Sequence, residues 1–252
     1  MSQATVTIIQ ARMASSRLPG KVLLDIAGQP MLARVVERAR RAHTVDQTVV
    51  ATTTDASDDP VERLCLERGY PCYRGSAHDV LDRYYQAARL FNAETIVRVT
   101  ADCPVIDPRL IDETVNALPS NDFVANRLPP PWGRTYPIGL DVEVCRFAGL
   151  ETAWKEASLP HQREHVMPFF YDNPQRFRIC LVNYSVDLSA YRWTVDTAED
   201  LELLRRVYAY FGGGDDFSWL EVLALFEREP ELAQINERVR HKHYREVDGR
   251  KW

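Results

Sequence analysis

Short apolar runs alternate with amphipathic stretches through the first half of the chain. The apolar runs are rich in β-branched side chains, which is typical of buried strands, and the stretches between them show the apolar spacing of helices. This pattern predicts strands at residues 6–9, 48–53, 71–73 and 95–100 and helices at residues 30–42, 58–67 and 79–91. Such alternation indicates parallel strands joined by right-handed crossovers. We therefore expect an α/β fold of Rossmann-like type, with a doubly wound and mainly parallel sheet.

The pattern becomes less regular after residue 121. Residues 127–139 are rich in proline and glycine, so they predict a long loop that forms an arm or a lid. The elements expected beyond this loop are a half-exposed strand at residues 140–145, helices at 147–157 and 162–170, strands at 177–182 and 191–195, and helices from Thr197 onward that are broken at 212–214 and followed by a charged tail after Arg238. We expect a single domain over residues 1–252, in which residues 121–190 form an insertion with a β-containing arm.

The composition is that of a globular protein without a nucleic-acid-binding surface. The chain has 252 residues, of which 45% are hydrophobic, and this is enough to bury a large core. Its net charge of −5 disfavours a broad contact with nucleic acid, so no nucleic-acid partner is expected. A local cluster of cations in such a chain indicates a small anion instead.

The cysteines and the apolar runs predict the cellular compartment of the protein. Five cysteines are scattered without a Cys-x-x-Cys pair, which favours reduced thiols over a disulfide framework or a zinc site. No apolar run approaches the roughly 20 residues that span a bilayer, and the chain enters its first strand without a signal-like segment. We therefore expect a cytoplasmic protein with no membrane association.

The loop after the strand at residues 6–9 is the first candidate binding site. It holds three cations and two hydroxyls, which are Arg12, Arg17, Lys21, Ser15 and Ser16. Cations so close together repel one another unless an anion lies between them, so the loop predicts a cradle for phosphate oxygens. It lacks both GxxxxGK[ST] and GxGxxG, which excludes the P-loop and the dinucleotide fingerprint. A solvated surface loop is the alternative interpretation.

Two carboxylates follow strands that lie far apart in the sequence. Asp102 comes after the strand at residues 95–100, and Asp196 comes after the one at residues 191–195. Carboxyl ends of parallel strands meet at one edge of a sheet, so the two side chains are expected to converge there. Together with substrate phosphates they would suit Mg²⁺, which favours a few carboxylates over an all-protein cage. The alternative for each is a helix cap, above all for Asp196 before TAED.

Four stretches of the sequence carry a resemblance to one enzyme family. They are ARMASSRLPGKVL in the first loop, VVATT, RGSAHDVLDRYYQAA and TVDTAEDL. In these stretches the chain resembles the cytidylyltransferases that activate acidic sugars, CMP-Kdo synthetase and acylneuraminate cytidylyltransferase, and most of all their spore-coat polysaccharide branch. The resemblance covers most of residues 5–115 and resumes at residues 191–201. It implies the nucleotide-diphospho-sugar transferase fold and a nucleotidyltransferase domain, in which residues 121–190 bind the acceptor and contribute to a homodimer.

The resemblance also implies a reaction and the residues that carry it. An oxygen of an acidic or related sugar attacks the α-phosphorus of CTP, which gives a CMP-sugar for surface polysaccharide and releases pyrophosphate, with Mg²⁺ as cofactor. Arg12, Arg17 and Lys21 correspond to the catalytic cations, and Asp102 and Asp196 correspond to the metal ligands. The implied nucleotide-binding residues are Ala11, Arg12, Ser15, Ser16, Arg17, Lys21, Thr100 and Ala101.

One departure from the family concerns the sugar. CMP-Kdo synthetases have Gln-Gly-Asp where this chain has Thr100, Ala101 and Asp102, a difference that affects sugar recognition more than the choice of base. The acceptor is expected beside the proline-rich loop, where a mobile lid would meet it. The candidate acceptor-binding residues are Arg83, Tyr136, Asp141, Glu143 and His165, with Arg127 and Arg134 close by in the sequence. A dimer contact is the alternative use of this loop.

Other functions remain open at this point. A glycosyltransferase on a GT-A-like fold is one, although the expected Asp-x-Asp metal motif is not apparent at Asp102. A nucleotide-binding homologue without turnover is another. His161, Glu164 and His165 match the HxxEH pattern of a zinc peptidase, but Pro160 and Pro168 confine the helix and no third ligand is evident. Cys103 has no neighbouring histidine base, so a nucleophilic role is not predicted.

Overall fold

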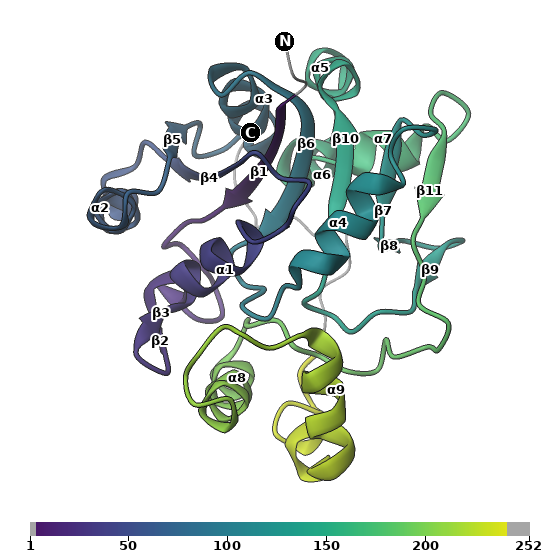
Figure 1. Cartoon of the computed structure of the whole chain (residues 1–252). Helices are drawn as coiled ribbons and strands as arrows, with labels where there is room; N and C mark the ends of the chain where they lie inside the picture. Colours follow the sequence, from purple (N-terminus) through teal and green to yellow (C-terminus); the bar gives the residue numbers. More distant parts are fainter. Residues whose placement is uncertain (1–3, 241–252) are drawn as a thin grey trace.

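The computed structural model describes residues 4–240, which form one mixed sheet covered by helices on both faces (Figure 1). The strands of this sheet are β1 (Ala4–Gln10), β4 (Gln47–Thr53), β5 (Cys72–Gly75), β6 (Ala93–Thr100), β7 (Phe123–Ala125), β10 (Glu143–Arg146) and β11 (Ile179–Leu181). Their order is β11-β7-β10-β6-β1-β4-β5. All neighbours pair in parallel except β10, which is antiparallel to β6 and to β7. The predicted α/β class with a mainly parallel sheet is confirmed.

Helices cover both faces because side chains alternate along the central strands. The helices are α1 (Met31–Ala39), α2 (Asp59–Arg68), α3 (Val80–Leu90), α4 (Pro108–Asn116), α5 (Phe147–Glu156), α6 (Pro160–His165), α7 (Pro168–Asp172), α8 (Ala198–Tyr210) and α9 (Trp219–Arg228), with short 3₁₀ turns η1 (Lys21–Leu23), η2 (Ala56–Asp58) and η3 (Pro230–Gln234). Ile9 of β1 belongs to the core formed with α1, α2, α4, α8 and α9. Val6 and Ile8 of the same strand belong to the core formed with α3, α5 and α7.

The predicted elements of the first half are present, and one helix was missed. Strands β1, β4 and β6 contain the predicted runs and extend them by one or more residues at an end. Helix α4 follows β6, and two local signals mark its start. The Asp107 side chain accepts the Arg109 N–H at 2.8 Å, and Pro108 occupies the first turn. Both features are common at helix starts.

Three predictions for the second half are wrong. The strand predicted as half-exposed at residues 140–145 is β10, whose residues up to Cys145 are buried, because β6 and β7 flank it and helices cover both faces. The helix predicted at 162–170 is divided into α6 and α7, with Val166 between them at a φ of 71°. Residues 191–195 form no strand and make one isolated bridge, between Ile138 and Arg192.

Segment 121–190 contributes to the sheet as well as to an arm. Strands β7, β10 and β11 belong to the seven-stranded sheet, in which β11 is an edge strand. The β-containing arm corresponds to β8 (Arg127–Leu128) paired with β9 (Gly133–Arg134), and a similar small pair, β2 (Asp25–Ile26) with β3 (Gln29–Pro30), precedes α1. Within the described residues no helix is long and apolar enough to cross a membrane. The charged tail predicted after Arg238 lies, from residue 241 on, outside the described residues.

Candidate active site

A cavity of about 300 Å³ opens where β1 and β6 end. Ligands of parallel sheets bind at this edge, because the loops that follow the strands gather there. The cavity is lined by the residues predicted to bind nucleotide and metal, which are Ala11, Arg12, Ser15, Ser16, Arg17, Lys21, Thr100, Ala101, Asp102 and Asp196. The predicted convergence of the first loop with both aspartates is therefore present, and the chemical roles of these residues stay predictions.

Local turns shape the first loop. Gly20 has a φ of 69°, which glycine adopts without strain, and its N–H donates to the carbonyl oxygen of Met13 at 2.8 Å. The Met13 N–H in turn donates to Oδ1 of Asp58 at 2.6 Å, which ties the loop to η2. Lys21 follows as the first residue of η1 and lines the cavity. The backbone thus holds the loop in place independently of its cations.

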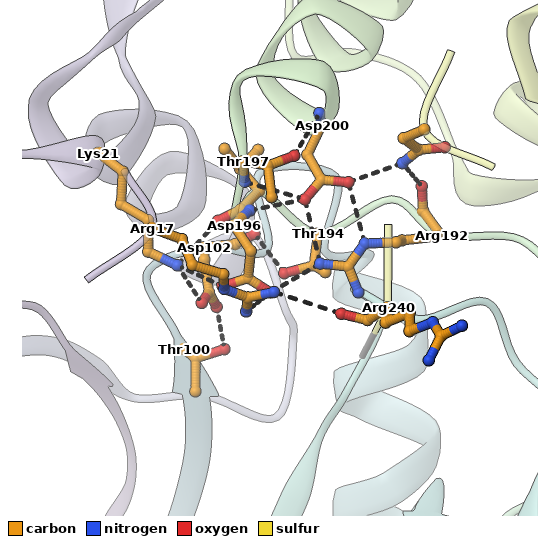
Figure 2. A network of polar contacts seen from close by, with 12 residues as sticks. Arg17, Lys21, Thr100, Asp102, Arg192, Thr194, Asp196, Thr197, Asp200 and Arg240 are labelled. Carbon is orange, nitrogen blue, oxygen red and sulfur yellow. Dashed lines mark hydrogen bonds and ion pairs between the residues drawn. The ribbon is translucent and has the colours of Figure 1, made fainter. Parts of the chain in front are cut away.

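Lys21 joins the two halves of the site (Figure 2). Its Nζ donates to Oδ2 of Asp102 at 2.7 Å, to the carbonyl oxygen of Val195 at 2.8 Å and to Oδ1 of Asp196 at 2.9 Å. These acceptors match the three N–H donors of an ammonium group. With Lys21 only 9% exposed, little water competes for these bonds.

The charges of this cluster support one another. Burial would lower the pKa of Lys21, but Asp102 and Asp196 raise it above its ordinary value. Burial would likewise raise the pKa of Asp196, but Lys21, Arg17 and Arg192 hold it below its ordinary value. The stabilisation from Asp196 is therefore present above about pH 4 and lost in stronger acid, whereas that from Lys21 is present below about pH 10 and lost in stronger base.

Two further arginines, Arg17 and Arg83, line the cavity. Nη2 of Arg17 lies 2.8 Å from Oδ2 of Asp196. Arg83 of α3 is 1% exposed, and its Nη1 donates to the carbonyl oxygen of Ser76 at 2.8 Å. Its Nε has no hydrogen-bond partner within residues 4–240, and burial lowers the pKa of Arg83 to about 10. The side chain of Arg83 lines the cavity, where an anionic or polar ligand would meet its charge.

The two aspartates fit a magnesium ion that is shared with phosphates. Oδ2 of Asp102 and Oδ1 of Asp196 face one point, since both contact Nζ of Lys21. Oδ1 of Asp102 accepts from Oγ1 of Thr100 at 2.6 Å, which orients that carboxylate. Residues 4–240 contain no group of three or more His, Cys, Asp and Glu side chains arranged as a metal cage. Two carboxylates that need phosphate oxygens to complete the shell are the donor set that Mg²⁺ favours.

Other residues that line the cavity carry paired charges. Arg98 of β6 forms an ion pair with Glu143 of β10, and its Nη2 donates to Oε1 of Gln10 at 3.0 Å. Asp141 accepts two hydrogen bonds of 2.9 Å from Arg134, and Nε of Arg127 lies 3.9 Å from the same carboxylate. Among the predicted acceptor-binding residues, this cavity is lined by Arg83, Asp141, Glu143 and His165. Arg127 lines it as well.

Tyr136 is the exception among the predicted acceptor-binding residues. It is 3% exposed and does not line the cavity. Its hydroxyl lies 3.3 Å from Oε2 of Glu113, and its ring packs against Tyr184 and Trp219. The prediction that Tyr136 contacts the acceptor is therefore wrong, because the proline-rich loop turns this ring into the core.

His161, Glu164 and His165 of the HxxEH pattern are not gathered at one metal site. Nε2 of His161 lies 2.8 Å from Oδ2 of Asp172, whereas Glu164 and His165 line the cavity. The two imidazoles therefore have different surroundings. Cys103 is buried, and burial together with the charge of Asp102 raises the pKa of its thiol well above the ordinary value. A thiol held in this form is a poor nucleophile.

Several residues of the site were missed by sequence reasoning. Arg98 stands inside the apolar run TIVRVT, and Arg192 stands in YRWTV. A charged side chain in a buried run needs a partner, and this signal was available from the sequence. Thr197 and Asp200 in TAED have the spacing of a capping box, which predicts the contact between them at the start of α8 but not the contact of Asp200 with Arg192. Gln10 and Asn236, by contrast, show no local sign of the contacts that they make.

Gly139 brings two segments together at the cavity wall. It has a φ of 107°, and a Cβ there would lie 2.5 Å from the backbone N of Thr194 and from the backbone C of Trp193. The backbones are joined on both sides of Ile138, which donates to the Tyr191 carbonyl oxygen at 2.9 Å and accepts from the Trp193 N–H at 2.6 Å. This close approach positions the segment that leads to Asp196.

Replacing Gly139 by alanine is expected to destabilise the protein more than a positive φ alone would. A non-glycine residue in this region of φ costs about 1–3 kcal/mol, and the backbone contact adds to that cost. Gly133→Ala is the matched control, because Gly133 has a similar φ of 119° and open space around its Cβ position. Urea unfolding of both variants measures the difference. Equal losses of unfolding free energy would show that the close approach carries no strain.

The comparisons with known proteins agree with this geometry. The spore coat polysaccharide biosynthesis protein SpsF of Bacillus subtilis is 32% identical over 91% of this chain and 97% of its own. A 3-deoxy-manno-octulosonate cytidylyltransferase of Anaeromyxobacter dehalogenans is 36% identical over 62% of this chain and 64% of its own. The structure of a cytidylyltransferase from Leptospira borgpetersenii, 33% identical, superposes with a TM-score of 0.87 over 95% of this chain and 100% of its own.

Fold and site together define a nucleotidyltransferase, since a loop of cations and two carboxylates meet where the parallel strands end. The sequence profile of the cytidylyltransferase family matches residues 6–229. The chain belongs to the cytidylyltransferase family and is a CTP-dependent nucleotidyltransferase.

Proposed function

We propose that this protein transfers CMP from CTP to a sugar-type acceptor and releases pyrophosphate, with Mg²⁺ as cofactor. The observation that carries the proposal is the convergence of Arg12, Arg17 and Lys21 with Asp102 and Asp196 on one cavity. Because these residues come from segments far apart in the sequence, a solvated surface loop does not account for their meeting. The charge pattern matches a triphosphate held with a divalent cation.

The first loop would hold the triphosphate and stabilise the charge that develops on it. Lys21 and Arg17 lie against carboxylates, so on CTP binding they would exchange some of these contacts for phosphate oxygens, while Mg²⁺ would take the carboxylate oxygens. Mg²⁺, held by Asp102 and Asp196, would neutralise charge on the attacked and leaving phosphates. No covalent intermediate with the protein is needed for in-line transfer.

The acceptor would bind at the end of the cavity formed by β6, β10 and α6. Carboxylates there, such as Glu143 and Asp141, suit the hydroxyls of a sugar, and Arg127 lines the same end. The names of SpsF and of the octulosonate enzyme support a sugar acceptor and a role in surface polysaccharide. We also propose a homodimer, in which segment 121–190 contributes both to acceptor binding and to the subunit contact.

Two measurements test the proposal. Calorimetric titration with CTP, ATP, GTP and UTP, each with and without Mg²⁺, is expected to show tightest binding of CTP and dependence on the metal. Pyrophosphate release in the presence of a panel of acidic and neutral sugars is expected with CTP and one class of acceptor. Absence of nucleotide binding would overturn the proposal.

The two alternatives give different results in the same experiments. A glycosyltransferase would bind a nucleotide sugar and release a nucleotide rather than pyrophosphate. A homologue without turnover would bind CTP with Mg²⁺ and release no pyrophosphate with any acceptor. Mass spectrometry of the products distinguishes a CMP-sugar from both outcomes.

A further inference from the structure

Behind Asp196 lies a buried pair that lines no part of the cavity, formed by Arg192 and Asp200 (Figure 2). Arg192 is 7% exposed and Asp200 is fully buried. Neither residue was among the predicted site residues. Burying two such charges costs free energy unless their hydrogen bonds are well formed. The partners of Arg192 and Asp200 therefore indicate what the pair does.

The Arg192 guanidinium bridges two carboxylates. Its Nη2 donates to Oδ2 of Asp196 at 2.7 Å and to Oδ2 of Asp200 at 3.0 Å, and its Nε donates to Oδ1 of Asp200 at 2.9 Å. The planar fork of arginine makes such a bridge, and the single ammonium of lysine does not reproduce it. Arg192 thus shares Oδ2 of Asp196 with Arg17, while Oδ1 accepts from Nζ of Lys21.

Asp200 holds the backbone of Asp196 through hydrogen bonds. Its Oδ2 accepts the N–H groups of Asp196 at 2.9 Å and of Thr197 at 3.1 Å, at the start of α8. Asp196 is therefore held from behind the cavity by its main chain through Asp200 and by its carboxylate through Arg192, in addition to the contacts of that carboxylate with Lys21 and Arg17. Residues 191–195 form no strand, and the segment before Asp196 is attached to the carbonyl oxygen of Asp102 by the Val195 N–H at 2.9 Å and by Oγ1 of Thr194 at 3.0 Å, so Arg192 and Asp200 supplement these contacts at Asp196 itself.

The C-terminal part of the described chain is attached to this pair. Nδ2 of Asn236, which is 5% exposed, donates to Oδ1 of Asp200 at 2.8 Å and to the carbonyl oxygen of Arg192 at 3.0 Å. A few residues later, the carbonyl oxygen of Arg240 accepts from Nη1 of Arg17 at 3.3 Å. The segment after η3 thus touches both the buried pair and the phosphate-binding loop.

We propose that Arg192 is a positioning residue for nucleotide transfer, and that Asp200 and Asn236 hold it in place. Arg192 holds the Asp196 carboxylate so that its Oδ1 stays directed at the point that it shares with Oδ2 of Asp102, the position that a shared Mg²⁺ would need. The inference rests on the proposed function for the role of Asp196. It extends that function to residues that touch neither nucleotide nor metal.

The test compares Arg192→Met and Arg192→Lys with the wild-type full chain. CTP binding is titrated calorimetrically at several Mg²⁺ concentrations and in EDTA, and kcat is measured from pyrophosphate release. Loss of a group that orients a metal ligand typically costs about 10- to 100-fold in metal affinity or activity. We expect a loss of this size in Mg²⁺-dependent CTP binding and in kcat for Arg192→Met. Arg192→Lys should recover fold stability more than function, and CTP binding in EDTA should change little.

Arg38→Met is the matched control for a merely structural role. Arg38 is also a buried arginine, but its Nε and Nη atoms donate to the carbonyl oxygens of Ile106, Asp215 and Phe217, away from the cavity. This variant should lose thermal stability and keep its Mg²⁺-dependent binding per folded molecule. Asn236→Ala should weaken Mg²⁺-dependent binding less than Arg192→Met does.

The outcomes separate the inference from the proposed function. If wild-type protein binds CTP in a Mg²⁺-dependent way and Arg192→Met binds it equally well per folded molecule, the positioning role is overturned while the proposed function stands. If wild-type protein binds CTP without dependence on Mg²⁺, both the metal assignment and the positioning role are overturned. A selective loss in Arg192→Met, absent from Arg38→Met, supports the inference.

Discussion

Replacing Lys21 by alanine is expected to lower the rate of pyrophosphate release by about 10²- to 10³-fold, the usual effect of removing one preorganised donor from a developing anion. The structure predicts a second consequence. Nζ of Lys21 lies between the carboxylates of Asp102 and Asp196, so the variant leaves two negative groups facing one another. Mg²⁺ should therefore raise the melting temperature of Lys21→Ala more than that of the wild type. Initial rates and thermal unfolding with and without Mg²⁺ measure both effects.

Lys155→Ala is the control for this experiment. Lys155 is an exposed lysine on α5 that pairs with Glu151 at 3.0 Å and lies outside the cavity. Its removal should leave the rate and the response to Mg²⁺ unchanged. A Lys21→Ala protein with wild-type turnover would remove Lys21 from the mechanism, and equal thermal responses to Mg²⁺ would argue against a metal site between the two aspartates.

The second large effect is expected for Asp102→Asn. The amide keeps the shape of the side chain and loses its charge, so the divalent cation loses one of its two protein ligands. A metal that stabilises several kcal/mol of developing charge is worth roughly 10³-fold in rate, and we expect a loss of that order. The fold should survive, because Lys21 keeps its bonds to Asp196 and to the carbonyl oxygen of Val195. Rates across a Mg²⁺ titration, with circular dichroism for the fold, measure both.

Asp112→Asn provides the comparison for the loss of a carboxylate. Asp112 of α4 accepts from the Thr44 N–H at 2.8 Å and from Oγ1 of Thr44 at 2.7 Å, and it does not line the cavity. This variant should lose stability at most. If Asp102→Asn shows the same Mg²⁺ dependence as wild-type protein, Asp102 does not ligate the cation.

Apolar periodicity predicted helices and strands well where no other local feature opposed it. Strand β1 and helix α3 have the apolar spacing of their class over several residues, and both are present close to the predicted bounds. Apolar periodicity gave the wrong element where the backbone conformation or the packing of particular residues interrupts the pattern. Val166, in the left-handed region of φ, divides a stretch whose apolar spacing resembles one helix. Residues 191–195 look like a strand, but they pair only through the isolated bridge between Ile138 and Arg192, which tertiary packing beside Gly139 brings together.

The candidate site shows the same division between local and distant information. That the cation-rich first loop lines the cavity was predictable, because several cations and hydroxyls within one turn-rich stretch have few other uses, and its phosphate-binding role stays a prediction. The convergence of Asp102 and Asp196 on the cavity was predictable from the carboxylate that follows β6 and from the family resemblance, and their role as metal ligands stays a prediction. Tyr136 was misplaced because its type and position in a loop do not tell which way the ring turns, and packing against Trp219 decides that.

The sequence by itself determined the α/β class, the parallel core strands and the identity of the cationic loop. These depend on periodicity and on groups of residues that are neighbours in the chain. Only the tertiary structure decided that Lys21 lies between Asp102 and Asp196, and that Arg192, Asp200 and Asn236 lie behind them. The physical reason is that hydrogen bonds and ion pairs act over a few ångströms, while the residues that make them are brought together by the packing of the whole sheet.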